Sequence, residues 1–189
     1  MKILPLIPNA INLFEALDTK FTNQTEWEFD GDEYTCSGMI NNDTYRVYLQ
    51  YITIDDTNTP LDNTTFLNLG FAKKISNEEE TEKLQKSNEN RSKVIGAVSN
   101  TLKDKVSELA NQFKIDFIVL FVIKEEEKRL RLYNLLVSSP MYGLRPWRKI
   151  GTVTTDEGFY VVCTKNKGQP PNIDEFIAWL KFNNKNFSN

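Results

Sequence analysis

A chain of 189 residues is long enough for one domain with a sizeable core. Its 23 Lys and Arg against 26 Asp and Glu leave a net charge of −3, so no general attraction pulls it onto nucleic acid or an anionic membrane. The absence of histidine excludes Ser-His-Asp and Cys-His hydrolases and the commonest zinc ligand; with only two, widely separated cysteines, we expect neither a metal site nor a disulfide.

The first eight residues form a short apolar run that two prolines interrupt. A secretory signal needs roughly 7–15 consecutive apolar residues, and a membrane span about 20. We therefore expect a protein of the cytoplasm that does not bind membranes. The composition also argues against sequence-specific recognition of nucleic acid.

The first third of the chain predicts one helix followed by strands. Asn9 is a suitable cap for a helix whose apolar face ends near Phe21. Alternating apolar residues and turn signals then predict four successive, largely antiparallel strands. These strands are expected over 27–29, 34–40, 45–53 and 66–71.

The rest of the chain alternates between helical and strand patterns. Residues 76–90 are charged and lack periodicity, which is typical of a solvated loop. After it we expect helix 91–113, strand 116–123, helix 125–138, strands 147–154 and 158–164, and helix 172–183. The pattern predicts an α/β (α+β) protein with a mixed, mostly antiparallel sheet flanked by helices. Residues 1–169 would form a single domain, and 170–189 a helix and tail packed on it or extending from it.

Two segments carry a family resemblance. The loop Gln85-Lys86-Ser87-Asn88-Glu89-Asn90 leads into a long helix, and Leu132-Tyr133-Asn134-Leu135-Leu136 lies on the next one. With the order of elements, they resemble the GNAT (GCN5-related N-acetyltransferase) fold over roughly residues 8–164. The resemblance implies that Gln85 and the amides at Asn88, Asn90, Arg91 and Ser92 hold the pyrophosphate of acetyl-CoA, and that Tyr133 protonates the departing thiolate.

The chain departs from the GNAT pattern at several of these positions. Asn replaces both expected loop glycines, and the Gly-Phe expected after Tyr133 is displaced or missing. Asn tolerates the left-handed conformation, but its side chain crowds an approaching anion. The loop can therefore also be structural, with Asn88 or Asn90 capping the helix, and Tyr133 can be a half-buried helix residue. Nothing singles out Glu28 or Glu33 as a catalytic base.

A second resemblance is to small bacteriophage proteins of uncharacterised role with a degenerate GNAT-like core. It rests on an Asn-rich loop, a Lys93-Val94-x-x-x-Val98 helix and the Arg129-x-x-Leu132-Tyr133 segment. It implies a non-catalytic scaffold, a phage accessory or virion-associated protein without a cofactor. Such a scaffold would act in the cytoplasm of the host bacterium or within the virion. The alternative is an N-acyltransferase that uses acetyl-CoA.

The scaffold interpretation requires a surface for a protein partner, such as another phage protein. Trp and Arg are common in interface hot spots, so Arg145, Trp147 and Arg148 are candidates for partner binding. Trp147 can equally pack over the sheet edge as part of the core. The lost glycines, the displaced Gly-Phe and the missing histidine favour the scaffold.

Overall fold

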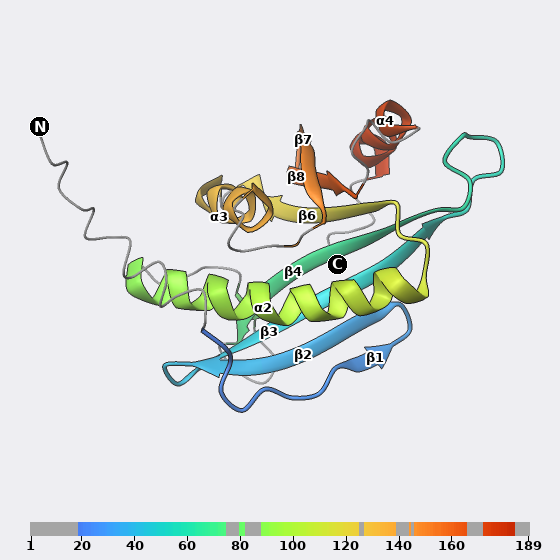
Figure 1. The fold of residues 1–189 in the computed structure, drawn as a ribbon. Coiled ribbons are helices and arrows are strands. Elements are labelled where there is room, and N and C mark those ends of the chain that lie inside the picture. Colours follow the sequence, from blue (N-terminus) through green and yellow to red (C-terminus); the bar gives the residue numbers. More distant parts are fainter. Residues whose placement is uncertain are drawn as a thin grey trace, which may run out of the picture.

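The computed structural model describes residues 19–74, 80–81, 88–124, 127–138, 144, 146–165 and 172–183 (Figure 1). The strands are β1 (Glu28–Asp30), β2 (Glu33–Ile40), β3 (Asp43–Ile54), β4 (Thr64–Lys74), β5 (Glu80–Thr81), β6 (Phe117–Ile123), β7 (Arg148–Thr154) and β8 (Gly158–Thr164). The helices are α2 (Asn88–Gln112), α3 (Glu127–Ser138) and α4 (Ile173–Asn183). The helix expected from Asn9 lies outside the described residues, except for 19–21, which are not helical.

The described strands form one eight-stranded sheet in the order β1-β2-β3-β4-β6-β8-β7, with β5 paired to β4 beside this path. All neighbours run antiparallel except β4 and β6, which are parallel and are connected through α2. A parallel pair needs such a crossover, whereas the antiparallel neighbours are joined by tighter turns. The predicted mixed, mostly antiparallel α+β architecture is confirmed.

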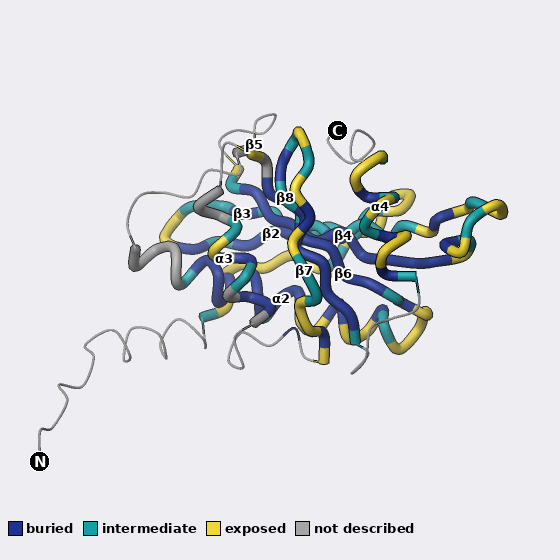
Figure 2. The backbone as a smooth tube through the Cα atoms, turned by 90° about the horizontal axis from the view of Figure 1, so that it is seen from above, coloured by how far each residue is buried: buried dark blue, intermediate teal, exposed yellow. Residues whose placement is uncertain are grey.

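The sheet has a hydrophobic core on each face. One core joins α2 and α3 to the sheet through residues such as Leu67, Leu69 and Ile118. The other places α4 against residues such as Phe66 and Phe117. Because both faces of the central strands are covered, buried residues follow β4, β6 and β8 almost without interruption (Figure 2).

Helix α2 packs on the sheet through one apolar stripe. Val94, Val98, Leu102, Val106 and Leu109 recur every three or four residues and are all buried. The helix begins at Asn88, three residues before the predicted start, because its first turn is polar and periodicity of apolar residues cannot locate it.

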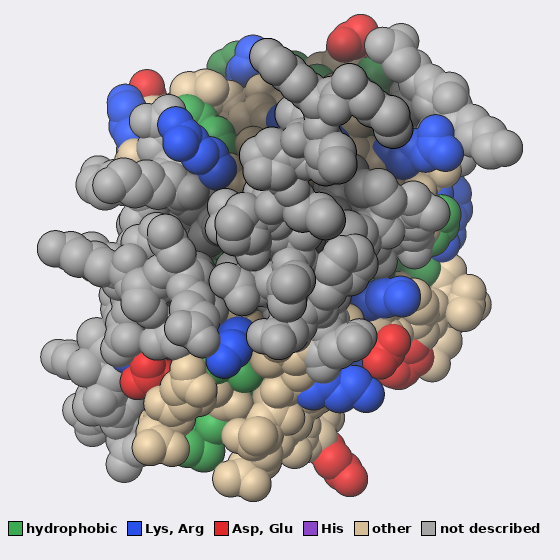
Figure 3. Space-filling model, turned by 60° about the vertical axis from the view of Figure 1, so that its left-hand side comes forward, with side chains coloured by type: hydrophobic (Ala, Val, Ile, Leu, Met, Phe, Trp, Pro, Cys, Tyr) green, Lys and Arg blue, Asp and Glu red, His purple; other side chains and the backbone are tan. Residues whose placement is uncertain are grey.

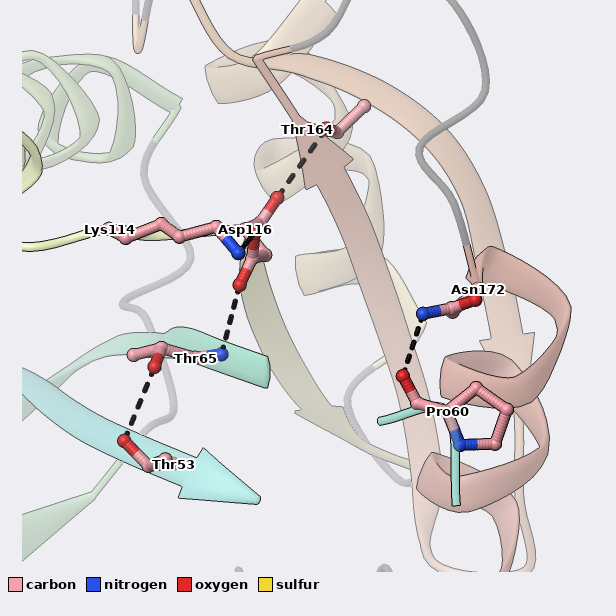
Figure 4. Close-up of polar contacts among 7 residues, drawn as sticks. All are labelled: Thr53, Pro60, Thr65, Lys114, Asp116, Thr164 and Asn172. Atoms are coloured by element: carbon pink, nitrogen blue, oxygen red, sulfur yellow. Dashed lines mark hydrogen bonds and ion pairs between the residues drawn. The ribbon is translucent and has the colours of Figure 1, made fainter. Parts of the chain in front are cut away.

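Polar contacts fix the start of the parallel pair and the position of α4 (Figure 4). An oxygen of the Asp116 carboxylate accepts a hydrogen bond from the Thr65 amide at 3.1 Å, and the Asp116 amide donates to the Thr65 carbonyl at 2.8 Å. The side chain of Asn172 donates to the Pro60 carbonyl at 2.7 Å. These contacts hold the first residues of β6 against β4 and the start of α4 against the β3–β4 connection.

Candidate functional site

The two parallel strands separate partway along their length. Pairing between β4 and β6 covers only Phe66–Leu69 with Phe117–Leu120. Strand β4 continues to Lys74, and β6 continues to Ile123, while β8 pairs with the other edge of β6 from Ile118 to Ile123. We call residues 70–74 of β4 and 121–123 of β6 the strand fork. It is the place where a ligand would enter the sheet if the protein held one between these strands.

Strand β5 lies on the edge of β4 that faces the fork. Lys73 pairs with Tyr45 of β3 on one side and with Thr81 of β5 on the other. A strand residue has two edges, so β5 occupies the edge directed toward β6. The sequence predicts a loop over all of 76–90, because a strand of two residues is too short to give a periodic pattern of apolar residues. The chain itself therefore satisfies the backbone groups at the end of β4 that a ligand would otherwise use.

Tyr133 lies in the core beside the fork. Its ring contacts Phe71 of β4 edge-on, with 6.0 Å between centroids, and both side chains are 1% exposed. On the opposite face the Tyr48 ring covers Gly70, where an added Cβ would lie 2.2 Å from it. Of the two interpretations of Tyr133, the structure supports a residue that packs within the helix-side core. Its side chain is almost completely buried, whereas the sequence predicts a half-buried one.

The predicted pyrophosphate-binding residues begin α2. Asn88, Asn90, Arg91 and Ser92 belong to its first turns, where backbone amides lack partners within the helix. Gln85, the remaining predicted pyrophosphate ligand, lies outside the described residues. Figure 1 places the start of α2 at the same end of the molecule as α3.

Basic side chains surround this end of the molecule. Lys74 is the last residue of β4, Lys124 directly follows β6, and Arg131 lies on α3. All three residues are exposed. Lys73 forms an ion pair with Asp43 at 2.8 Å. Figure 3 shows more Lys and Arg than Asp and Glu among the described side chains of this face.

The described residues offer few groups for chemistry at the fork. Burial raises the pKa of Cys36 to about 11 and that of Cys163 to about 12, the latter against an opposing effect of Lys149, so both thiols stay protonated at neutral pH. Glu33 is paired with Arg46 at 2.8 Å, and Glu28 lies on the edge strand β1. No three His, Cys, Asp or Glu side chains within the described ranges form a set that could hold a metal.

The predicted partner-binding segment divides between the core and the surface. Trp147 is 2% exposed and packs in the helix-side core, with the Lys165 ammonium 5.0 Å from its ring centre. The structure thus supports the core interpretation of Trp147 over the docking one. Arg148 is exposed at the start of β7, and Lys149 beside it donates to the Asn134 side chain at 2.7 Å. Arg145 lies outside the described residues.

Two polar groups that the sequence did not single out lie on the α4 side of the sheet. The Asn68 side-chain oxygen and the Tyr160 hydroxyl are buried, and neither has a hydrogen-bond partner in the described structure. Burial is also the main cause that raises the pKa of Tyr160 to about 12. Inside alternating strands these residues look like ordinary half-buried positions, so no sequence signal marks them.

Comparison with protein-family models and with curated proteins found no match for this chain. Among the described helices, none combines the length and the apolar character needed to cross a membrane.

Proposed function

We propose that this chain is a non-catalytic GNAT-like scaffold that binds a protein partner as a bacteriophage accessory or virion-associated protein. Four strands, a long helix, a strand, a helix and two strands follow in the order that the GNAT resemblance implies, with β5 as an addition. A fold can persist without its chemistry, so the site must decide between scaffold and enzyme.

The observation that carries the proposal is the closure of the strand fork by the protein's own residues. Strand β5 occupies the β4 edge at Lys73 and Lys74, and Tyr133 packs against Phe71 in the core beside the fork. An acyl thioester between β4 and β6 would have to displace both. Tyr133, excluded from solvent, would then have to leave a filled core position to reach a thiolate.

The exposed basic residues at the start of β7 are the surface that we assign to the partner. Arg148 and Lys149 stand next to each other on an edge strand, so a partner can meet both their charges and the free backbone edge. Trp147, which directly precedes Arg148, is buried in the helix-side core and fixes the start of β7 to it. Affinity capture with the full chain should lose its partner with Arg148→Glu.

Calorimetric titration with acetyl-CoA and with CoA, together with thermal shift, tests the proposal. A scaffold gives no heat and no shift at millimolar ligand. Micromolar binding would contradict the proposal, because a closed fork cannot accept the pantetheine arm without a measurable cost. The same titration on Phe71→Ala tests the filled core directly: if only this variant binds, side-chain packing is what closes the fork.

An acyl-CoA-dependent N-acyltransferase is the second candidate. The short parallel pairing of β4 with β6, beside a helix start and basic side chains, favours it. Backbone amides around Asn88–Ser92 would then hold pyrophosphate, and Tyr133 would donate the proton to the CoA thiolate while an amine takes the acetyl group. Asn90→Glu should abolish CoA binding without unfolding the protein, because a carboxylate repels pyrophosphate but suits a helix N-terminus.

A further inference from the structure

One edge of the sheet is acidic. Residues 21–45, which include β1 and β2, contain six acidic residues and no Lys or Arg: Glu26, Glu28, Asp30, Asp32, Glu33 and Asp43. Glu33 and Asp43 are neutralised by Arg46 and Lys73. Glu26, Glu28 and Asp30 are exposed and form no ion pair in the described part of the chain. We call these three residues, on or next to β1, the acidic edge.

The other edge of the sheet is basic. Residues 128–155, which include β7 and all of α3 except its first residue, Glu127, contain six basic residues: Lys128, Arg129, Arg131, Arg145, Arg148 and Lys149. Asp and Glu are absent from this range and return at Asp156 and Glu157, in the turn after β7. Arg148 and Lys149 are exposed on β7, and the described structure gives neither of them a carboxylate partner. We call Arg148 and Lys149 the basic edge.

The two edges lie at opposite ends of the sheet. Strands β1 and β7 are the first and last in the strand order, and Figure 1 shows them on opposite sides of the molecule. Six inter-strand spacings of about 4.8 Å separate them by roughly 30 Å, so the two edges cannot neutralise each other within one molecule. Within the described part of the chain, each of them has a neighbouring strand on one side only, and their exposed charges are opposite.

We propose that copies of this chain associate head to tail, with the acidic edge of one copy pairing with the basic edge of the next. The proposal deepens the proposed function, on which it rests, by naming a second copy of the chain as a partner of the β7 surface. Because two different surfaces meet, the contact is heterologous and can continue from copy to copy as a ring or a filament.

Charged side chains protect an edge strand from pairing with another copy because edges of the same charge repel each other. Here the signs are opposite, so charge attracts and also selects the register. The edges offer apolar contact as well. Phe29 on β1 is 58% exposed and rests on the Tyr34 ring at 4.4 Å, and Ile150 on β7 is only partly buried. Each edge can thus contribute backbone groups, charge and one apolar side chain.

Sedimentation velocity of the full chain measures this association. At about 0.01 M salt, where the Debye length is roughly 30 Å, the weight-average mass should rise with protein concentration above the 21.9 kDa of one copy. At about 1 M salt, where that length is roughly 3 Å, it should return to one copy. A chain that stays monomeric at low salt and high concentration overturns the proposal.

A charge swap identifies the surfaces. Glu28→Lys with Asp30→Lys makes both edges basic, and Arg148→Glu with Lys149→Glu makes both edges acidic. Each double variant alone should remain monomeric, and an equal mixture of the two should associate again because opposite edges are restored. Two control variants change the net charge by the same amounts at exposed positions away from the edges. They are Asp55→Lys with Asp104→Lys, and Lys103→Glu with Lys124→Glu. Both controls should associate like the wild type.

Two results would overturn the edge geometry even if the wild type associates. One is association of either edge variant alone at the wild-type level, and the other is a mixture that stays monomeric although circular dichroism shows both variants folded. These results can be distinguished from a failure of the proposed function, because the proposed function is tested by the CoA titration and not by association. A monomeric chain that ignores CoA still fits a scaffold whose β7 partner is another protein.

Discussion

Tyr160 bears a hydroxyl that is buried without a hydrogen-bond partner in the described structure. A buried polar group that lacks a partner costs about 1–3 kcal/mol of desolvation. Tyr160→Phe keeps the ring, which packs 4.8 Å from Phe121, and removes the unpaired oxygen. We expect the free energy of unfolding in urea to stay the same or rise by about 1 kcal/mol. A loss of that size would mean that the hydroxyl is hydrogen-bonded in solution.

Buried ionisable groups also predict how stability depends on pH. Burial raises the pKa of Cys36 to about 11 and those of Cys163, Tyr45 and Tyr160 to about 12. The unfolded chain releases these protons first, from about pH 9 for thiols and 10 for phenols, so the stability they confer is complete below pH 9 and is lost toward pH 12. Urea unfolding between pH 8 and 11 should show this decline.

The thiols account for the first part of that decline. Cys36→Ala with Cys163→Ala should flatten the pH dependence between about pH 9 and 10, where the thiols of the unfolded chain titrate ahead of most of its phenols. The slope is the measured quantity, because the alanines also lower stability at every pH by leaving small cavities. An unchanged slope would show that the thiols are not buried in solution.

Helix α4 depends on one aromatic cluster for its place on the sheet. Phe176 is fully buried, stacks on Phe117 at 4.1 Å and meets Phe66 edge-on. Phe176→Ala should lower the free energy of unfolding by about 3–5 kcal/mol. Phe182→Ala, on the same helix and 85% exposed, should change it by less than about 0.5 kcal/mol. Equal losses for the two variants would place α4 differently from the structure.

Elements with a strong pattern could be predicted from the sequence, and short or polar ones could not. The alternation in 45–53 and the apolar stripe of α2 predict β3 and the long helix, because burial on one face imposes the period. Strand β5 has two residues and no period, and its pairing with β4 depends on tertiary contact alone. The same limit applies to the site: the GNAT resemblance suggests Tyr133 as a candidate and residue type suggests Trp147, but only packing places both in the core.

At the scale of the whole sheet, the described residues of its two edges have opposite charges, although the net charge of the chain is only −3. At about 0.1 M salt the Debye length is roughly 10 Å, which is a third of the width of the sheet. An ion-exchange resin that contacts one edge of the sheet is therefore screened from the charges of the other edge. The protein should therefore be retained by a cation exchanger at pH 7 despite its negative net charge. Arg148→Glu with Lys149→Glu should weaken that retention more than Lys103→Glu with Lys124→Glu, which changes the net charge equally. Identical elution of the two variants would show that the β7 surface is not the basic pole of the molecule, and head-to-tail association would then lose its electrostatic cause.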